Sequence, residues 1–159
     1  MIKLQKSTFN EIEHIFVSSC NRRYFSNNFE KKYRNCAQCE FYEIINYNLI
    51  VGGLILHDYD EYSNRIMFTI AISEEQQNKG IGKMTMKRIL DYIFKDRKIR
   101  RIYIEVYETN ERAIKLYEEF GFIKEGRLRK HTYKNGDYID LFIMGLLKEE
   151  YMRKFYTGR

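Results

Sequence analysis

A glycine-bearing loop between a strand-like run and a helical pattern is the part of this sequence best suited to bind an anion. Its residues are Gln77-Asn78-Lys79-Gly80-Ile81-Gly82-Lys83. Glycine lets the backbone approach a ligand closely, and free N–H groups at a helix N-terminus, helped by Lys79 and Lys83, favour a pyrophosphate. The spacing fits neither a Walker loop nor a G-x-G-x-x-G dinucleotide fingerprint. A glycine that only turns the chain or caps the helix is therefore the alternative.

A short amphipathic helix pattern runs from Asn110 to Gly121, one strand-like run further along. Asparagine is a common residue before a helix, and glycine is a common residue after one. The apolar spacing predicts a buried helix face made of Ala113, Leu116, Tyr117 and Phe120. Taken alone, this pattern indicates packing and assigns no chemistry to Tyr117.

Together, the Q-x-x-G-x-G loop and the helix that opens at Asn110 resemble the GNAT superfamily of N-acetyltransferases, whose acetyl-CoA site uses both elements. The resemblance runs from about Ile66 to Leu147 and is faint before Phe41. The segments 121–129 and 133–140 resemble the subgroup that contains ribosomal-protein N-terminal acetyltransferases and spermidine acetyltransferases. They also occur in amino-sugar acetyltransferases, so the resemblance leaves the acceptor open.

The resemblance implies that acetyl-CoA is the cosubstrate and that the loop from Gln77 to Lys83 binds it, with the pyrophosphate on the backbone of Asn78 to Lys83. It also implies that the pantetheine arm lies along a strand edge at Ile70, Ala71 and Ile72. There the strand over 66–72 would splay away from the strand over 101–107 and leave its edge amides free. Asn110 would contact the cofactor as well.

Two residues match catalytic positions of the family. Tyr117 matches the tyrosine proposed to protonate the departing CoA thiolate, and Glu105 stands where ribosomal-protein alanine acetyltransferases have a glutamate base. A surface carboxylate within a sheet is the alternative for Glu105. A lysine-like amine of pKa about 10.4 is neutral only about once in 10³ molecules at pH 7, whereas a peptide α-amine of pKa about 7.7–8.0 needs far less help. A peptide N-terminal amine is therefore favoured over a polyamine, an amino sugar or another small amine.

The remaining elements predict how these residues are positioned. Strand-like and helical patterns are mixed along 159 residues, which favours one α/β or α+β domain over residues 1–159. The resemblance implies a mixed central sheet of about six to seven strands flanked by about four helices. Asn46 and Asn48 predict a tight turn, Gly52-Gly53 predicts a bulge or a close backbone approach, and Asn135-Gly136 predicts a hairpin. The predicted helices are 8–20, 27–36, 80–96 and 110–121, and the predicted strands are 41–46, 49–57, 66–72, 101–107, 122 onward and 139–147.

Composition narrows the class of protein. A net charge of +6 suggests an anionic partner, either a nucleic acid or a polyphosphorylated small molecule. No apolar run approaches the roughly 18 residues of a membrane span, and the N-terminus lacks the apolar core of a signal peptide, so a cytoplasmic protein is expected. The cysteines Cys20, Cys36 and Cys39 are too few for a disulfide scaffold, and the scattered histidines give no zinc spacing. We expect neither a metal nor a covalent acetyl-enzyme.

Two other classes of function stay open. The basic run Lys95-Asp96-Arg97-Lys98-Ile99-Arg100-Arg101 suggests a nucleic-acid-binding module, although no recognised RNA- or DNA-binding motif accompanies it. A non-catalytic acyl-CoA-binding protein would keep the cofactor loop without turnover. The tail 148–159 is charged and rich in tyrosine, and it either packs as a helix or pairs with a second copy of the chain. Dimers are common in the superfamily, so a homodimer is possible.

Overall fold

The amino-terminal half of the sheet is a set of antiparallel strands joined by short turns. A computed structural model describes residues 1–18 and 20–157. Strands β1 (Ile2–Ser7), β2 (Glu40–Asn46), β3 (Leu49–Asp60) and β4 (Arg65–Ile72) pair in that order. Tyr47 and Asn48 both have positive φ, 47° and 63°, as a two-residue hairpin turn with the twist of a sheet requires. The expected tight turn is confirmed.

The carboxy-terminal half adds β5 (Arg101–Tyr107), β6 (Ile123–Lys134) and β7 (Asp137–Leu147). The seven strands follow the order β1-β2-β3-β4-β5-β7-β6, with β4 and β5 parallel and the other neighbours antiparallel. Asn135 and Gly136 form the predicted hairpin turn between β6 and β7, with φ of 52° and 88°. The expected mixed α/β sheet is confirmed.

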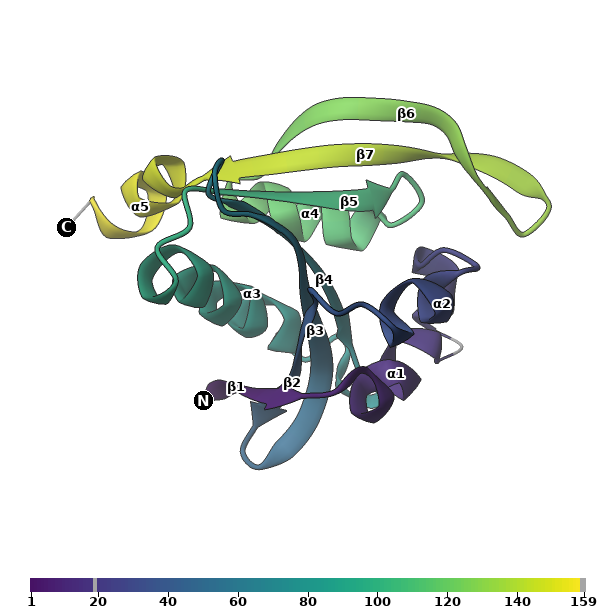
Figure 1. Cartoon of the computed structure of the whole chain (residues 1–159), viewed down its shortest axis with the longest axis horizontal. Helices are drawn as coiled ribbons and strands as arrows, with labels where there is room; N and C mark the ends of the chain where they lie inside the picture. Colours follow the sequence, from purple (N-terminus) through teal and green to yellow (C-terminus); the bar gives the residue numbers. More distant parts are fainter. Residues whose placement is uncertain (19, 158–159) are drawn as a thin grey trace.

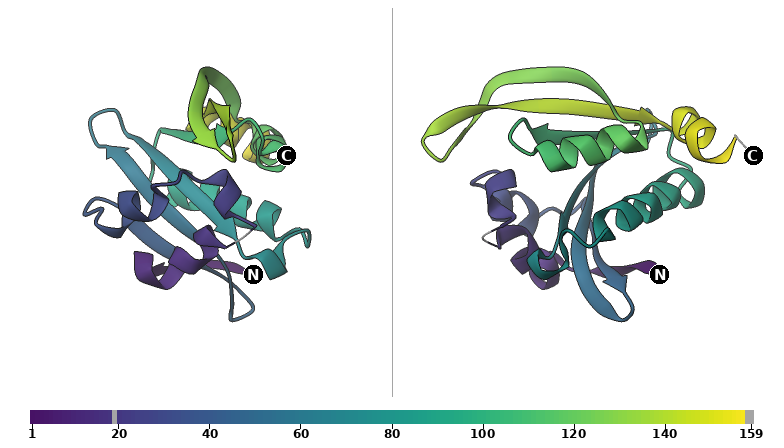
Figure 2. Two further views of the ribbon diagram at one scale, coloured as in Figure 1. Left: turned by 90° about the vertical axis from the view of Figure 1, so that its right-hand side faces the viewer. Right: turned by 180° about the vertical axis from the view of Figure 1, so that it is seen from behind.

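Helices cover both faces of this sheet. They are α1 (Phe9–Val17), α2 (Phe29–Arg34), α3 (Ile81–Asp91), α4 (Glu111–Phe120) and α5 (Lys148–Tyr156). Helices α1 and α2 lie on one face of β2 to β4, and α3 lies on the other (Figure 2). Two separate apolar clusters result, a small one under α1 and α2 around Phe16 and Ile55, and a larger one under α3 and α4.

Strands β4 and β5 are paired only at one end. Their register joins Arg65 to Arg101, Ile66 to Ile102 and Met67 to Tyr103, and no pairing follows. Beyond Met67 the strands diverge, as Figure 1 shows. The splay implied by the family resemblance is confirmed, and it leaves one edge of β4 from Phe68 to Ile72 without a strand partner among the described residues.

Two glycines in β3 accept the close approach predicted for them. A Cβ on Gly52 would lie 2.5 Å from the Ala71 carbonyl oxygen, and one on Gly53 would lie 2.7 Å from a ring carbon of Phe16. A bulge accompanies them in β3 itself: Ile44 and Ile45 of β2 pair with Gly52 and Ile50, so Val51 of β3 has no register partner on β2. These glycines let α1 and β4 pack directly against the β3 backbone.

Several boundaries differ from the prediction for local reasons. The first helix ends at Val17 because the Asn21 side chain donates to the Ile15 carbonyl at 2.8 Å and takes up a free acceptor of its last turn. Residue 19 of the predicted helix lies outside the described residues. The helix predicted over 80–96 is regular α-helix only as far as Asp91, and Tyr92–Asp96 form a π-helical turn. The Arg97 N–H donates a hydrogen bond to the Tyr92 carbonyl at 3.0 Å across that turn.

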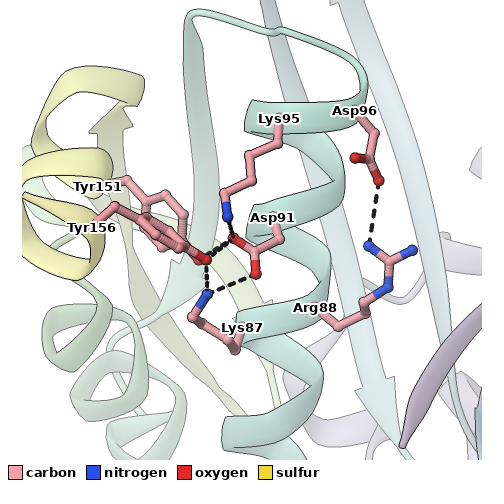
Figure 3. Close-up of polar contacts among 7 residues, drawn as sticks. All are labelled: Lys87, Arg88, Asp91, Lys95, Asp96, Tyr151 and Tyr156. Carbon is pink, nitrogen blue, oxygen red and sulfur yellow. Dashed lines mark hydrogen bonds and ion pairs between the residues drawn. The ribbon is translucent and has the colours of Figure 1, made fainter.

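The C-terminal tail packs as helix α5 against α3, one of the two arrangements expected for it. Asp91 of α3 accepts hydrogen bonds from the hydroxyls of Tyr151 at 3.1 Å and Tyr156 at 2.6 Å (Figure 3). Lys87 donates to the other oxygen of Asp91 at 2.6 Å, and Lys95 lies 3.5 Å from the carboxylate. The Asp91 carboxylate therefore connects α3 with α5.

Two further expectations concern cysteines and the membrane. Cys36 and Cys39 form a disulfide just after α2, whereas Cys20 is free. From the cysteine count we expect no disulfide scaffold, and this single bridge does not make one. Its loop has only four residues, so it constrains the unfolded chain little. Among the described residues, no helix is long and apolar enough to cross a bilayer.

Candidate active site

A cavity of about 800 Å³ lies where β4 and β5 diverge. One end is lined by the loop before α3 and by α4. The other end is lined by the segment 21–33, the last part of β3, the middle of β4, the end of β5 and part of β6. Apolar and polar groups from several helices and strands converge in this cavity, so it is the site against which the predicted residues are compared.

The loop before α3 presents backbone N–H groups at one end of the cavity. Gly80 precedes α3 with a φ of 75°, a left-handed conformation that glycine adopts without strain. A Cβ on Gly80 would meet nothing within 4 Å, so the space beside it is open. The first N–H groups of a helix have no partner within it, and the positive end of the helix dipole adds to them. This end suits a phosphate group.

Gln77 holds the start of this loop to the end of β4. Its amide nitrogen donates to the Ile72 carbonyl at 3.0 Å and to the Asn21 side-chain oxygen at 3.1 Å. Arg112 of α4 donates to the Gln77 oxygen at 2.7 Å and to the Asn78 oxygen at 3.1 Å. The prediction missed Arg112, although a basic residue in the first turn of α4 was a readable signal.

The predicted cofactor residues do not all reach the cavity surface. Ile81 is buried in the larger apolar cluster, and Lys79 and Gly80 do not line the cavity. Lys83 lines it but its ammonium pairs with Glu119 of α4. The other predicted cofactor residues all line the cavity: Ile70, Ala71, Ile72, Gln77, Asn78, Gly82, Asn110 and Tyr117.

Asn110 caps helix α4, as predicted from the sequence. Its side-chain oxygen accepts the Ala113 N–H at 3.3 Å. The predicted buried face is partly wrong, because Ile114 is buried in place of Ala113 and Leu116, which are half-buried. Ala113 and Leu116 instead line the cavity, so α4 turns one apolar edge toward it.

Tyr117 lines the cavity from α4 and is 9% exposed. Its ring packs against Phe68 and Phe122, with centroids 6.5 Å and 5.6 Å away. Burial raises the pKa of the phenol well above its usual value of about 10. The hydroxyl therefore keeps its proton at neutral pH, as a group that is to act as an acid must.

Glu105 lines the cavity from β5, and its side chain is exposed. Residues alternate between the two faces of a strand, so Glu105 shares a face of β5 with Tyr103 and Tyr107. Tyr107 also lines the cavity, but Tyr103 does not, and its hydroxyl accepts a hydrogen bond from Arg65 at 3.0 Å. The structure thus brings Glu105 and Tyr117 to the walls of one cavity.

A buried polar cluster that the prediction missed lies at the end of the cavity away from α3. His57 is 3% exposed, and its Nε2 lies 2.9 Å from the Thr69 hydroxyl and 3.3 Å from the Tyr33 hydroxyl. Its Nδ1 has no hydrogen bond, and Asp58 lies 3.6 Å from it. Burial lowers the pKa of His57 from 6.5 to about 4, so the ring is neutral at pH 7. A lone histidine in an apolar strand gave no signal of this cluster.

Most basic side chains of the run at 95–101 form ion pairs within the chain. Lys95 pairs with Asp91, Arg97 with Glu40, and Arg101 with Glu125. A nucleic-acid surface needs cations that are free to meet phosphates. The run therefore gives little support to the nucleic-acid reading. In the described part of the chain, no three His, Cys, Asp or Glu residues gather as a metal site would require.

The mixed sheet, the splay and the phosphate-suited loop define an acyl-CoA-binding type of fold. The sequence profile of the Acetyltransferase (GNAT) family matches residues 6–122, and the chain belongs to that family. The resemblance stated from the sequence is confirmed.

Relatives of this chain include acetyltransferases that are named for different acceptors. The spermidine N(1)-acetyltransferase of Vibrio cholerae is 33% identical over 105 residues, which cover 66% of this chain and 61% of that protein. The L-amino acid N-acetyltransferase AaaT of Escherichia coli is 30% identical over 81 residues, 51% of this chain and 50% of that protein. The sequence match thus spans less than two thirds of either relative's length.

A solved structure shows the same fold. The spermidine N-acetyltransferase from Vibrio cholerae in complex with CoA and spermine superposes with a TM-score of 0.81 at 23% identity. That match covers 95% of this chain and 98% of the other.

Proposed function

We propose that the protein transfers an acetyl group from acetyl-CoA directly to a primary amine. The observation that carries the proposal is the single cavity at the β4–β5 splay, which joins the loop before α3, the free edge of β4, Tyr117 and Glu105. The family to which the chain belongs supports the reaction class. A pyrophosphate would bind at the loop from Gln77 to Lys83 and the pantetheine arm would follow Ile70, Ala71 and Ile72.

In the proposed reaction, the free amine attacks the thioester carbonyl carbon, and the carbon–sulfur bond then breaks. Tyr117 gives its proton to the departing thiolate and regains one from solvent. The amine loses its proton to Glu105, directly or through water. Asn110 supports the site by fixing the start of α4, the helix that carries Tyr117.

The test measures thiol release from acetyl-CoA with peptides, free amino acids, amino sugars and polyamines as acceptors, and acetyl-CoA binding by calorimetry. We expect binding without any acceptor and thiol release that depends on one. Binding without release across all acceptors would favour the alternative of a non-catalytic acyl-CoA-binding protein. Absence of binding would refute the proposal.

The named relatives act on unlike acceptors, one on spermidine and one on an L-amino acid, so they do not select an acceptor for this chain. The cytoplasmic location, the absence of a metal and the homodimer stay predictions. Sedimentation at several concentrations measures the oligomeric state.

A further inference from the structure

The end of the cavity away from α3 carries one group of each charge sign. Among the described residues that line this end, Glu105 of β5 is the carboxylate and Lys32 of α2 is the ammonium. His57 is neutral there at pH 7, because burial lowers its pKa to about 4. The charges that an incoming acceptor meets are therefore those of Glu105 and Lys32.

Neither of these two groups is neutralised by a neighbour. Within the described part of the chain, no ion pair of 4.0 Å or less involves Lys32 or Glu105. The two charges nevertheless interact electrostatically. Burial lowers the pKa of Lys32, but Tyr33, Glu105 and Asp58 together raise it more, so the net shift is upward. Two opposite charges thus face one cavity without contact between them.

The surroundings of Lys32 are basic. Between Cys20 and Cys36 the chain carries Arg22, Arg23, Lys31, Lys32 and Arg34 against the single acid Glu30. Glu30 is already paired with Arg22. Asp58, Asp60 and Glu61 follow His57 in the sequence, but none of these three acids lines the cavity. At this end of the cavity a polycation would therefore meet one carboxylate, Glu105, and one repelling cation, Lys32, on a segment with an excess of basic residues.

We propose, as an extension of the proposed function, that the acceptor is a primary amine that also carries an anionic group, a carboxylate or a phosphate. Its amine lies toward Glu105 and its anion toward Lys32. Such an acceptor bridges the two unpaired charges, whereas a polyamine gains one attraction and meets a repulsion. Lys32 is thus the residue that determines acceptor specificity.

The test compares acceptors that share an amine and differ in the anion: β-alanine with β-alaninamide, and glucosamine 6-phosphate with glucosamine. Spermidine is the polycation. For each acceptor, kcat/KM is measured by thiol release with the unaltered protein, with Lys32→Gln and with Lys31→Gln. Lys31 lies on the same helix, is exposed and does not line the cavity, so it is the matched control.

We expect a preference of about tenfold or more for the anionic member of at least one pair. Lys32→Gln should reduce that preference toward one, mainly through KM, while Lys31→Gln retains it. The change in this preference from the unaltered protein to Lys32→Gln is a ratio of ratios, so differences in amine basicity within a pair cancel in that change. Which pair responds separates a carboxylate from a phosphate.

Two results would overturn the inference and leave the proposed function intact: turnover that favours spermidine or the uncharged members, or a preference that Lys32→Gln does not change. Silence with every acceptor would overturn both the inference and the proposed function.

Discussion

Tyr117 and His57 are buried titratable side chains at the same cavity, and burial moves their pKa values in opposite directions. The low-dielectric surroundings disfavour the charged form of each, so the phenol pKa rises and the imidazole pKa falls to about 4. Both side chains are therefore neutral at pH 7. The phenol holds a proton that it can give, whereas the imidazole keeps a lone pair for hydrogen bonding.

Replacing Tyr117 with phenylalanine removes the proposed acid and leaves the ring. We expect kcat to fall by about 10²- to 10⁴-fold, because a positioned acid contributes that much. Acetyl-CoA affinity should stay within about twofold and the fold should be retained, since within the described residues the hydroxyl makes no hydrogen bond. Thiol release and calorimetry measure the two effects. An unchanged kcat would exclude Tyr117 as the acid.

His57 gives the stability of the protein a pH dependence. Its pKa is 6.5 when unfolded and about 4 when folded, so between these values the unfolded state binds more protons. We expect the free energy of unfolding to fall as the pH falls from about 6.5 to 4, and to fall less steeply in His57→Gln. Urea titrations at several pH values measure it. His131→Gln, at an exposed imidazole, is the control, and equal slopes in all three proteins would contradict the prediction.

At the scale of elements, local patterns predicted most of the fold, and ten of the thirteen predicted site residues line the cavity. Strand 101–107 and the turn at Asn135-Gly136 were predicted at their observed positions because alternation and turn chemistry are local signals. The π-helical turn after Asp91 and the place of Lys32 at the cavity depend on packing between distant segments, which no local pattern encodes. Ile81 was misplaced because a loop motif does not say which side chains point inward.

Helix α5 depends on Asp91 for its polar attachment to α3 (Figure 3). We expect Asp91→Asn to cost about 1–2 kcal/mol of unfolding free energy at pH 7, because the hydroxyls of Tyr151 and Tyr156 then bond a neutral acceptor and Lys87 loses its counter-charge. Urea unfolding measures this loss. Asp96→Asn, at a carboxylate that contacts only Arg88 in Figure 3, should cost less.

The same network gives a prediction in acid. Burial raises the pKa of Asp91, but hydrogen bonds from Lys87, Tyr156 and Tyr151 lower it more, so the net pKa is below its usual value. Its contribution to stability is present above the unfolded pKa of about 3.9 and is lost as the pH falls through the folded pKa. The stability gap between the unaltered protein and Asp91→Asn should therefore close in strong acid. A gap that persists there would show that the charge is not its cause.

At the scale of the whole molecule, the β6–β7 hairpin closes over the segment that walls the acceptor end of the cavity. Lys134, 8% exposed, donates to the Arg22 carbonyl at 2.8 Å, to the Phe25 carbonyl and to the Asn27 side-chain oxygen at 3.4 Å. Asn27 in turn donates to the Tyr133 carbonyl at 3.4 Å. A residue near the end of the sheet thus orders a segment near the start of the chain.

Replacing Lys134 with methionine leaves these carbonyls without their donor. We expect a loss of about 1–3 kcal/mol of unfolding free energy, faster amide exchange in residues 20–30, and a raised KM for the acceptor with little change for acetyl-CoA. Hydrogen exchange and steady-state kinetics measure these effects. Arg129→Met, at an exposed residue of the same hairpin, is the control. Unchanged exchange in residues 20–30 would contradict the role of Lys134.

The Lys134 contact has a consequence for the order in which the protein matures on the ribosome. The bond to Arg22 joins residues 112 positions apart, so the acceptor wall cannot be fastened until nearly the whole sheet has been synthesised. The loop before α3, the edge of β4 and helix α4, whose Arg112 holds that loop, are all complete once residue 120 has been synthesised. A nascent chain is thus able to assemble its nucleotide-facing end first, and the end that selects the amine takes its final form last.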